Sequence, residues 1–322
     1  MKISEFVARC LRKIIRIFYK NEWWDESNVE LYGQQANDYL KVAIINNKNG
    51  LMVTKFGTIE LNAVCCCKRQ KQGYRISDYK DYIFGKGCIY PHESIKALNI
   101  NAGFFPIDLQ LQNEYTQLVL NDTKDIDILG SYVNQESYLK QELEHCKKID
   151  IYGYCAPFAW NNPWTEALEG KKVLVVHPFT ESIKKQYEKR KYLFEDERVL
   201  PEFKELILVK AVQSIADNGK NTGFDTWFDA LKYMEKEIDS KDYDIALIGC
   251  GAYGMNLAAH CKRNGKIAIH MASWVQMLFG IYGDRWVNQQ PEYKNLINKY
   301  WVRPMESERP NGVEKVENAA YW

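Results

Sequence analysis

A glycine-rich turn near the end of the chain has the residue types and the spacing to hold a phosphate group. Residues 249–254, Gly-Cys-Gly-Ala-Tyr-Gly, follow the apolar run 245–248 and precede the helical spacing of residues 255–263. Glycines let the backbone approach a bound group closely, and the unpaired N–H groups at a helix start favour an anion. The candidate phosphate-binding residues of this turn are Gly249, Gly251, Tyr253 and Gly254.

The G-x-G-x-x-G spelling of this turn also suggests a dinucleotide site, which the following residues do not favour. A nicotinamide site uses an acidic residue about 20 residues further on, at the end of the next strand, to hold the ribose. That place carries His270, and no Asp or Glu lies between Met255 and Tyr282. Two other interpretations of the turn therefore stay open. It binds a different phosphate-bearing ligand, or its glycines serve only the packing of the fold. His270, which ends the strand at 266–270, and Ser273, which follows it, are further candidates.

A second corner between a strand and a helix carries a carboxylate. Residues 57–60, Gly-Thr-Ile-Glu, follow an apolar strand at 51–56 and precede a helical run. Glu60 either serves there as a base or metal ligand, or it is favoured only by the dipole of the helix that it begins. Lys55, near the end of the same strand, is a candidate donor to a ligand phosphate.

A third corner lies after the apolar strand at 172–177, where Pro178 and Phe179 lead into a helix. His177 ends the strand and Glu181 begins the helix, so both are candidates to line a pocket. The loops that follow parallel strands meet at one edge of a sheet, and ligands bind at that edge. We therefore expect the turns near positions 58, 178 and 251 to form one cleft.

Length and composition exclude several classes of protein. The chain of 322 residues can form one large α/β domain or two small ones. Its 43 Lys and Arg nearly balance 42 Asp and Glu, so the charge gives no indication of nucleic-acid binding. None of the 9 Cys has paired C-x-x-C spacing, which indicates reduced thiols in the cytoplasm, not a disulfide framework or a zinc site.

Residues 1–20 predict a basic amphipathic helix. Their apolar residues recur at helical spacing, and six Lys or Arg stand against a single Glu. The segment is too charged to span a bilayer and lacks the apolar core of a signal peptide. Such a helix either lies in the interface of an anionic membrane or docks on its own domain. The sequence leaves both interpretations open.

The rest of the chain alternates between strand and helix patterns, which predicts an α/β fold with a mostly parallel, Rossmann-like sheet flanked by helices. Strands are expected at residues 51–56, 125–129, 149–152, 172–177, 205–212, 245–248 and 266–270. Residues 75–105, rich in Tyr, Gly and Lys, are expected to be irregular. We divide the chain into an N-terminal helix and connector (1–35), the α/β domain (36–290) and a C-terminal helix and tail (291–322).

Several phrases of the sequence resemble the GT-D-type glycosyltransferase fold family of bacterial surface-glycan synthesis. They are FGTIE (56–60), NAGFFP (101–106), NPW (162–164), LEGKKVLVVHPF (168–179), QYEKR (186–190), IALIGCGAYG (245–254), HMAS (270–273) and FGIYGDRW (279–286). The resemblance covers roughly residues 36–287. It implies a Rossmann-like domain that binds a nucleotide-sugar, with a D-x-E motif for metal and diphosphate after the first strand. Here that triplet is Thr58-Ile59-Glu60, so Glu60 is carried over and Thr58 replaces the Asp.

The resemblance implies transfer of a sugar from a nucleotide-sugar, first of all a UDP-sugar, to a glycan or a polyprenyl-lipid-linked acceptor. This would serve the synthesis of capsule, O-antigen or another surface polysaccharide, in the cytoplasm or at the inner face of the cell membrane. Glu60 would be the base or a ligand of Mn²⁺ or Mg²⁺, and the loss of an Asp at Thr58 weakens such a metal site. The expected donor-binding residues are Lys55, Gly57, Thr58, His177, Glu181, Gly249, Gly251, Tyr253, Gly254, His270 and Ser273. The alternatives are a non-catalytic subunit that binds sugar-nucleotide or glycan, and an NAD(P)-dependent oxidoreductase.

Overall fold

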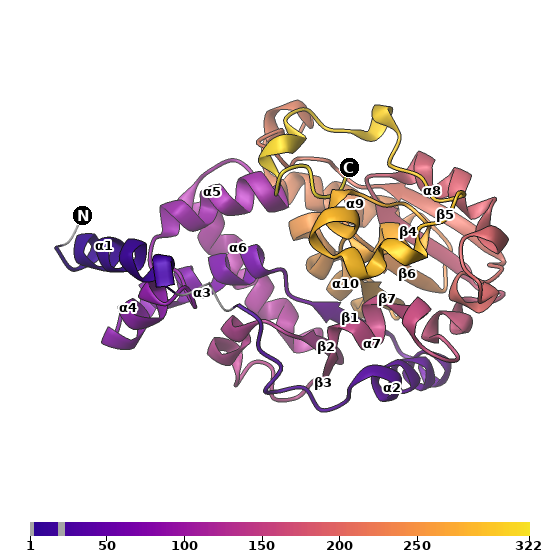
Figure 1. The fold of residues 1–322 in the computed structure, drawn as a ribbon, viewed down its shortest axis with the longest axis horizontal. Coiled ribbons are helices and arrows are strands. Elements are labelled where there is room, and N and C mark those ends of the chain that lie inside the picture. The colour runs from indigo at the N-terminus through magenta and orange to yellow at the C-terminus, as the bar shows by residue number, and fades with distance from the viewer. Residues whose placement is uncertain (1–2, 19–22) are drawn as a thin grey trace.

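A seven-stranded sheet forms the centre of the protein, and its neighbouring strands are parallel (Figure 1). The computed structural model describes residues 3–18 and 23–322. The strands are β1 (Leu51–Lys55), β2 (Ile128–Ser131), β3 (Lys147–Asp150), β4 (Lys172–His177), β5 (Glu205–Lys210), β6 (Ile245–Ile248) and β7 (Ile267–His270). Their order across the sheet is β3-β2-β1-β7-β6-β4-β5. The predicted α/β, Rossmann-like fold class is therefore confirmed.

The helices cover both faces of this sheet (Figure 1). They are α1 (Ile3–Phe18), α2 (Gly33–Asn46), α3 (Thr58–Gln72), α4 (Ile76–Ile83), α5 (Pro91–Ala102), α6 (Leu109–Asp122), α7 (Ile151–Cys155), α8 (Thr180–Tyr187), α9 (Trp227–Asp239), α10 (Gly254–Arg263) and α11 (Trp274–Leu278). With the right-handed crossovers of parallel strands, α3, α6, α9 and α10 belong to one face and α8 to the other. The contacts of α10 with α6 and α9 agree with this arrangement.

The inner strands are rich in apolar residues, as expected for strands that are buried on both faces. Val53 of β1 pairs with Ile128 on one side and with Ile269 on the other. Strands β4 and β6 are likewise buried, whereas β5 at the edge of the sheet is partly exposed. Continuous apolar runs are typical of parallel strands that helices cover on both sides. This pattern explains why the sequence reveals the inner strands so clearly.

Residues 75–105 are mostly helical, so the prediction of an irregular segment is wrong. Pro91 occupies the first position of α5, where its missing N–H costs no hydrogen bond. Gly103 follows the helix in the left-handed conformation (φ 81°) that ends many helices. Gly85 (φ 80°) lies just after α4. The glycines that we took as breaks within a loop thus separate two short helices.

The C-terminal segment packs on the α/β body. Where we expected a C-terminal helix and tail, residues 291–322 form short 3₁₀ turns. Val313 and Trp322 are buried. The carboxylate of Glu308 accepts hydrogen bonds from the backbone N–H groups of Glu181 and Ser182, at the start of α8. The segment therefore contributes to the protein interior and reaches the carboxyl edge of the sheet.

Within residues 3–18 and 23–322, no helix combines the length and the apolar character that crossing a bilayer requires.

Candidate functional site

The loops that follow β1, β4, β6 and β7 line one cavity of about 650 Å³. Thr58, Pro178 and Gly251 are all part of its wall. The structure thus brings together the three corners that we expected to converge. Strands β4 and β6 are neighbours, but the chain leaves β4 for β5 on one side through α8 and leaves β6 for β7 on the other side through α10. Ligands of open α/β sheets bind where the connections of neighbouring strands run in opposite directions.

The corner after β1 places a carboxylate in the cavity. Helix α3 begins at Thr58, and Glu60 lies in its first turn. A Cβ on Gly57 would collide with the Glu60 carboxylate, so the glycine lets this side chain fold back over the helix start. Glu60 is half-buried and borders the cavity. Burial raises the pKa of Glu60, and the nearby ammonium of Lys55 only partly opposes this effect.

Lys55 provides a positive charge beside Glu60. Its Nζ donates a hydrogen bond of 3.2 Å to the hydroxyl of Tyr132, which itself donates to the Phe56 carbonyl at 2.7 Å. Burial works against the charged form, yet the pKa of Lys55 is raised because Tyr132 and Glu60 stabilise the ammonium. The lysine therefore keeps its charge inside the cavity, where it can attract an anionic ligand.

His177, at the end of β4, faces the cavity as a neutral imidazole. Its Nδ1 accepts a hydrogen bond of 3.0 Å from the backbone N–H of Phe179. Burial lowers the pKa of His177 to about 3, so the ring is uncharged near neutral pH. Because Nδ1 acts as the acceptor, the proton lies on Nε2. The cavity wall thus contains a neutral N–H donor at this corner.

The three glycines of the turn at 249–254 are required by close packing. A Cβ on Gly249 would collide with the Ala272 carbonyl, and one on Gly251 (φ 60°) would lie 2.7 Å from the Ala102 carbonyl oxygen. A Cβ on Gly254 would collide with the ring of His270. These contacts account for the G-x-G-x-x-G spelling without a dinucleotide. Gly249, Gly251 and Tyr253 nevertheless line the cavity, together with Ser273, so the turn has a free side.

His270, Glu181 and Gly254 lie outside the cavity wall. His270 is buried in the interior, and its Nδ1 lies 2.9 Å from Thr54 Oγ1. Burial, with a smaller contribution from Lys55, lowers its pKa to about 3. Glu181 is exposed on α8. At the place where a dinucleotide site needs an acid for the ribose, the structure has a buried neutral imidazole.

Sequence reasoning missed an ion pair at the cavity. Arg285 bonds to the carboxylate of Glu317, and its guanidinium carbon lies 4.6 Å from the centre of the Tyr321 ring. Burial disfavours the charge of Arg285, but Tyr321 and Glu317 raise its pKa overall. All three residues line the cavity. The signal for Arg285 was its place in the phrase FGIYGDRW, whereas nothing in the sequence marks Glu317 or Tyr321.

Aromatic rings that sequence reasoning did not place form another part of the wall. Trp24 packs on Tyr132 with ring centres 5.2 Å apart, and on Tyr152 with ring centres 5.7 Å apart. Trp23 and Trp274 also line the cavity. Flat apolar faces beside charged groups suit a ligand that combines rings with phosphate.

The carboxylates at the cavity do not fit a divalent metal. Mg²⁺ and Mn²⁺ favour several oxygen ligands with negative charge. Glu60 has Lys55 as its charged neighbour, and Glu317 already pairs with Arg285. In the part of the chain that the structure describes, no three His, Cys, Asp or Glu side chains gather as a metal site requires.

Comparison with known proteins gives few matches. No protein-family model and no curated protein matches the chain. Among solved structures, the chain is similar to one described as the selenomethionine-substituted structure of domain of unknown function 1792 (DUF1792). The identity is 12%, the match covers 94% of this chain and 96% of that chain, and the TM-score is 0.35. A likeness at this level carries no argument about function, which must come from the site itself.

Proposed function

We propose that the protein is a glycosyltransferase that binds a nucleotide-sugar, first of all a UDP-sugar, in the cavity at the carboxyl edge of the sheet. One observation carries the proposal: the Glu60 carboxylate, beside the Lys55 ammonium, borders the same cavity as the turn at 249–253. The volume of about 650 Å³ suits a ligand of nucleotide-sugar size. The acceptor would be a glycan or a lipid-linked precursor of a surface polysaccharide.

Positive charge and neutral donors would bind the diphosphate of the donor. Lys55 and Arg285 are cations at the cavity, and His177 offers its Nε2–H without adding charge. When the bond between the sugar and the diphosphate breaks, negative charge grows on the leaving oxygen. Cations and N–H groups that are already in position stabilise this charge more than they stabilise the substrate. The aromatic wall would hold the base or the sugar by stacking.

Glu60 would act as the general base. In the transfer, the acceptor oxygen bonds to the anomeric carbon, the nucleoside diphosphate departs with the bonding electrons, and the acceptor proton moves to Glu60. Because burial raises its pKa, the carboxylate takes up a proton more readily than one in water. The ammonium of Lys55 favours the ionised carboxylate and so opposes part of the effect of burial.

We also propose the cytoplasm as the compartment of this reaction. All 9 cysteines are free, including the three neighbours at 65–67. Free thiols in this number are typical of proteins that work in a reducing compartment.

Replacing the base tests the proposal. Glu60→Gln keeps the size of the side chain and should lower the release of nucleoside diphosphate by about 10²- to 10⁴-fold. The matched control is Glu181→Gln, which changes an exposed carboxylate outside the cavity and should leave turnover unchanged. The assay uses UDP-, GDP-, CMP- and dTDP-sugars, and circular dichroism checks the fold of both variants.

Near-normal turnover by Glu60→Gln would reject the role of the carboxylate. If the unaltered protein binds a donor but neither hydrolyses nor transfers it, the result would instead favour a non-catalytic binding subunit. The poor fit of the cavity to a metal ion favours the same alternative.

A further inference from the structure

A second cavity of about 590 Å³ lies beneath α1. Thr58 and Ile59, in the first turn of α3, line both this cavity and the first one. Glu60 is the next residue of the same turn. The end of the second cavity at Thr58 and Ile59 therefore lies within one helical turn of the proposed base.

The second cavity has an excess of positive charge. The basic side chains that line it are Arg9, Arg12, Lys13 and Arg16, and among the side chains that the structure describes the one acid in its wall is Glu93. Glu93 pairs with Arg9 at 2.6 Å. Among the side chains that the structure describes, no carboxylate lies within salt-bridge distance of Arg12, Lys13 or Arg16. Arg12 is half-buried, and it donates to the Tyr82 carbonyl at 2.8 Å and to the Gly87 carbonyl at 3.4 Å, both of them neutral acceptors.

Helix α1 docks through its narrow, basic side. Ala8 is buried at this contact. The guanidinium groups of Arg9 and Arg12 lie over the rings of Tyr90 and Tyr82, at 4.1 and 4.3 Å from the ring centres. The domain therefore holds the helix without covering its apolar face. The helix can dock on its own domain and still present this face to a membrane.

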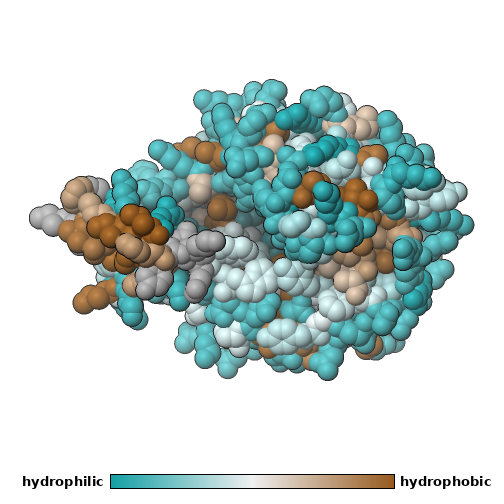
Figure 2. All heavy atoms as spheres, viewed as in Figure 1, coloured by the Kyte–Doolittle hydropathy of each residue, from teal (hydrophilic) through white to brown (hydrophobic). Residues whose placement is uncertain are grey.

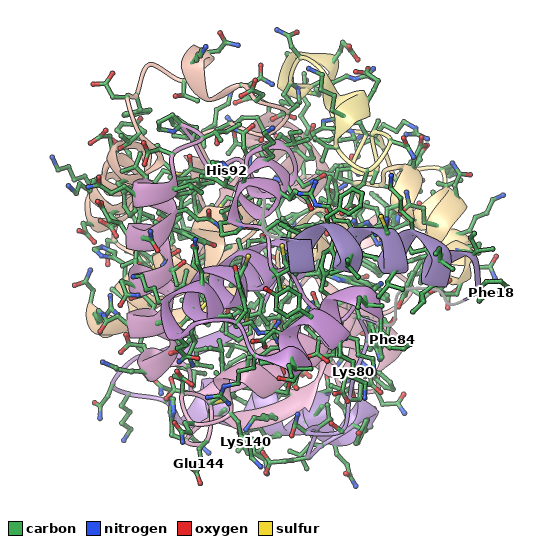
Figure 3. All side chains as sticks on the ribbon, turned by 90° about the vertical axis from the view of Figure 1, so that its left-hand side faces the viewer. Phe18, Lys80, Phe84, His92, Lys140 and Glu144 are labelled. Atoms are coloured by element: carbon green, nitrogen blue, oxygen red, sulfur yellow. The ribbon has the colours of Figure 1, made fainter. Side chains whose placement is uncertain are left out.

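The apolar face of α1 is exposed. It consists of Phe6, Val7, Leu11, Ile14, Ile17 and Phe18. Figure 2 shows this face as a brown cluster at the end of the molecule where Figure 1 places α1, and Figure 3 shows Phe18 at the end of the helix. For example, 55% of the surface of Ile14 is exposed to solvent. An exposed apolar helix face beside uncompensated Arg and Lys is complementary to the interface of an anionic bilayer.

We propose that the second cavity binds the phosphate or diphosphate of a lipid-linked acceptor, presented by an anionic membrane in which the apolar face of α1 lies. The guanidinium of Arg12 and the charges of Lys13 and Arg16 bind the phosphate oxygens. The sugar end of the acceptor passes Thr58 and Ile59 to reach Glu60. This inference rests on the proposed function, since it assigns the acceptor of that reaction.

Vesicle sedimentation with the full chain tests the charge. We expect binding to vesicles of phosphatidylcholine with phosphatidylglycerol, and stronger binding when they also contain a polyprenyl phosphate. The double variant Arg12→Gln/Arg16→Gln should bind these vesicles about 30-fold more weakly, since each basic residue near an anionic surface is worth about a factor of five. The control Lys184→Gln/Lys185→Gln removes two charges from exposed positions of α8 and should bind normally. An equal loss in both pairs, or binding of soluble inorganic diphosphate without any binding of vesicles, would overturn the proposal.

A second pair of variants tests the apolar face. Leu11→Ser/Ile14→Ser should weaken vesicle binding by at least about tenfold, because each side chain loses burial in the interface. Val42→Ser/Ile45→Ser is the control, since it removes two exposed apolar residues from α2; Ile45 has 63% of its surface exposed. Unchanged partition of the α1 variant would contradict the membrane contact.

Donor binding by the same proteins separates this proposal from the proposed function. Donor binding without partition into either kind of vesicle would overturn the lipid-linked acceptor and leave the glycosyltransferase in place. Partition that depends on Arg12 and Arg16, but with no donor bound, would remove the proposed function and with it the acceptor role.

Discussion

Replacing His270 by Gln should change how the stability of the protein depends on pH. His270 is 5% exposed, and burial, with a contribution from Lys55, lowers its pKa to about 3. In the unfolded chain its pKa returns to about 6.5. Between these two pH values the unfolded state therefore holds a proton that the native state lacks. The free energy of unfolding then falls as the pH falls.

The size of this effect follows from proton linkage. Because the pKa is lowered in the native state, the contribution of His270 to stability is fully present above about pH 6.5 and is lost progressively toward pH 3. A difference of one bound proton is worth about 1.4 kcal/mol per pH unit. From pH 6.0 to pH 4.5, His270 should therefore lower the free energy of unfolding by about 2 kcal/mol. His270→Gln cannot take up this proton and should remove that part of the loss.

Urea unfolding followed by tryptophan fluorescence at pH 6.0 and pH 4.5 measures this change. The change between the two pH values is compared, so any constant cost of the substitution cancels. His92→Gln is the control, because His92 lies on the surface (Figure 3) and its imidazole meets water in both states. Equal losses of stability in the unaltered protein and in His270→Gln would refute the reasoning.

Two further predictions concern the glycine turn and the proposed base. Gly254→Ala should destabilise the protein by roughly 1–3 kcal/mol, because the new methyl group collides with the buried ring of His270; a melting temperature equal to that of the unaltered protein would contradict this packing. For Glu60, whose pKa is raised by burial, kcat/KM for transfer should fall on acidification at pH values above those at which an ordinary glutamate titrates, since only the ionised carboxylate accepts the proton. A profile that stays flat until the range of a solvent-exposed glutamate would oppose that role.

The positions of the strands and of three corners of the cavity were predictable from the sequence. Buried parallel strands have apolar runs in their sequence, such as residues 172–177. The loops after such strands lie at one edge of the sheet. Thr58, Pro178 and Gly251 could therefore be placed together before any coordinates were known. The spelling of the turn at 249–254 was less informative, because packing alone requires its glycines.

The rest of the cavity depends on tertiary contacts that leave no local pattern. Arg285, Glu317 and Tyr321 come from C-terminal segments without helical or strand periodicity, and long-range packing alone brings them to the sheet edge. Trp24 reaches the cavity through contacts with aromatic rings of distant segments. The amphipathic pattern of α1 was visible in the sequence, but only the fold reveals that its apolar face points outward.

The most direct test of the account is whether the cavity at the sheet edge binds a nucleotide-sugar. Thermal unfolding is measured with UDP-, GDP-, CMP- and dTDP-sugars for the unaltered protein, for Ser273→Phe, which fills the cavity, and for Ser240→Phe, which places the same ring on the surface. At a ligand concentration of 100 Kd, binding stabilises the native state by about 2.7 kcal/mol. We predict that at least one donor raises the melting temperature of the unaltered protein and of Ser240→Phe but not that of Ser273→Phe. No shift with any donor, or the same shift in Ser273→Phe, would contradict the account.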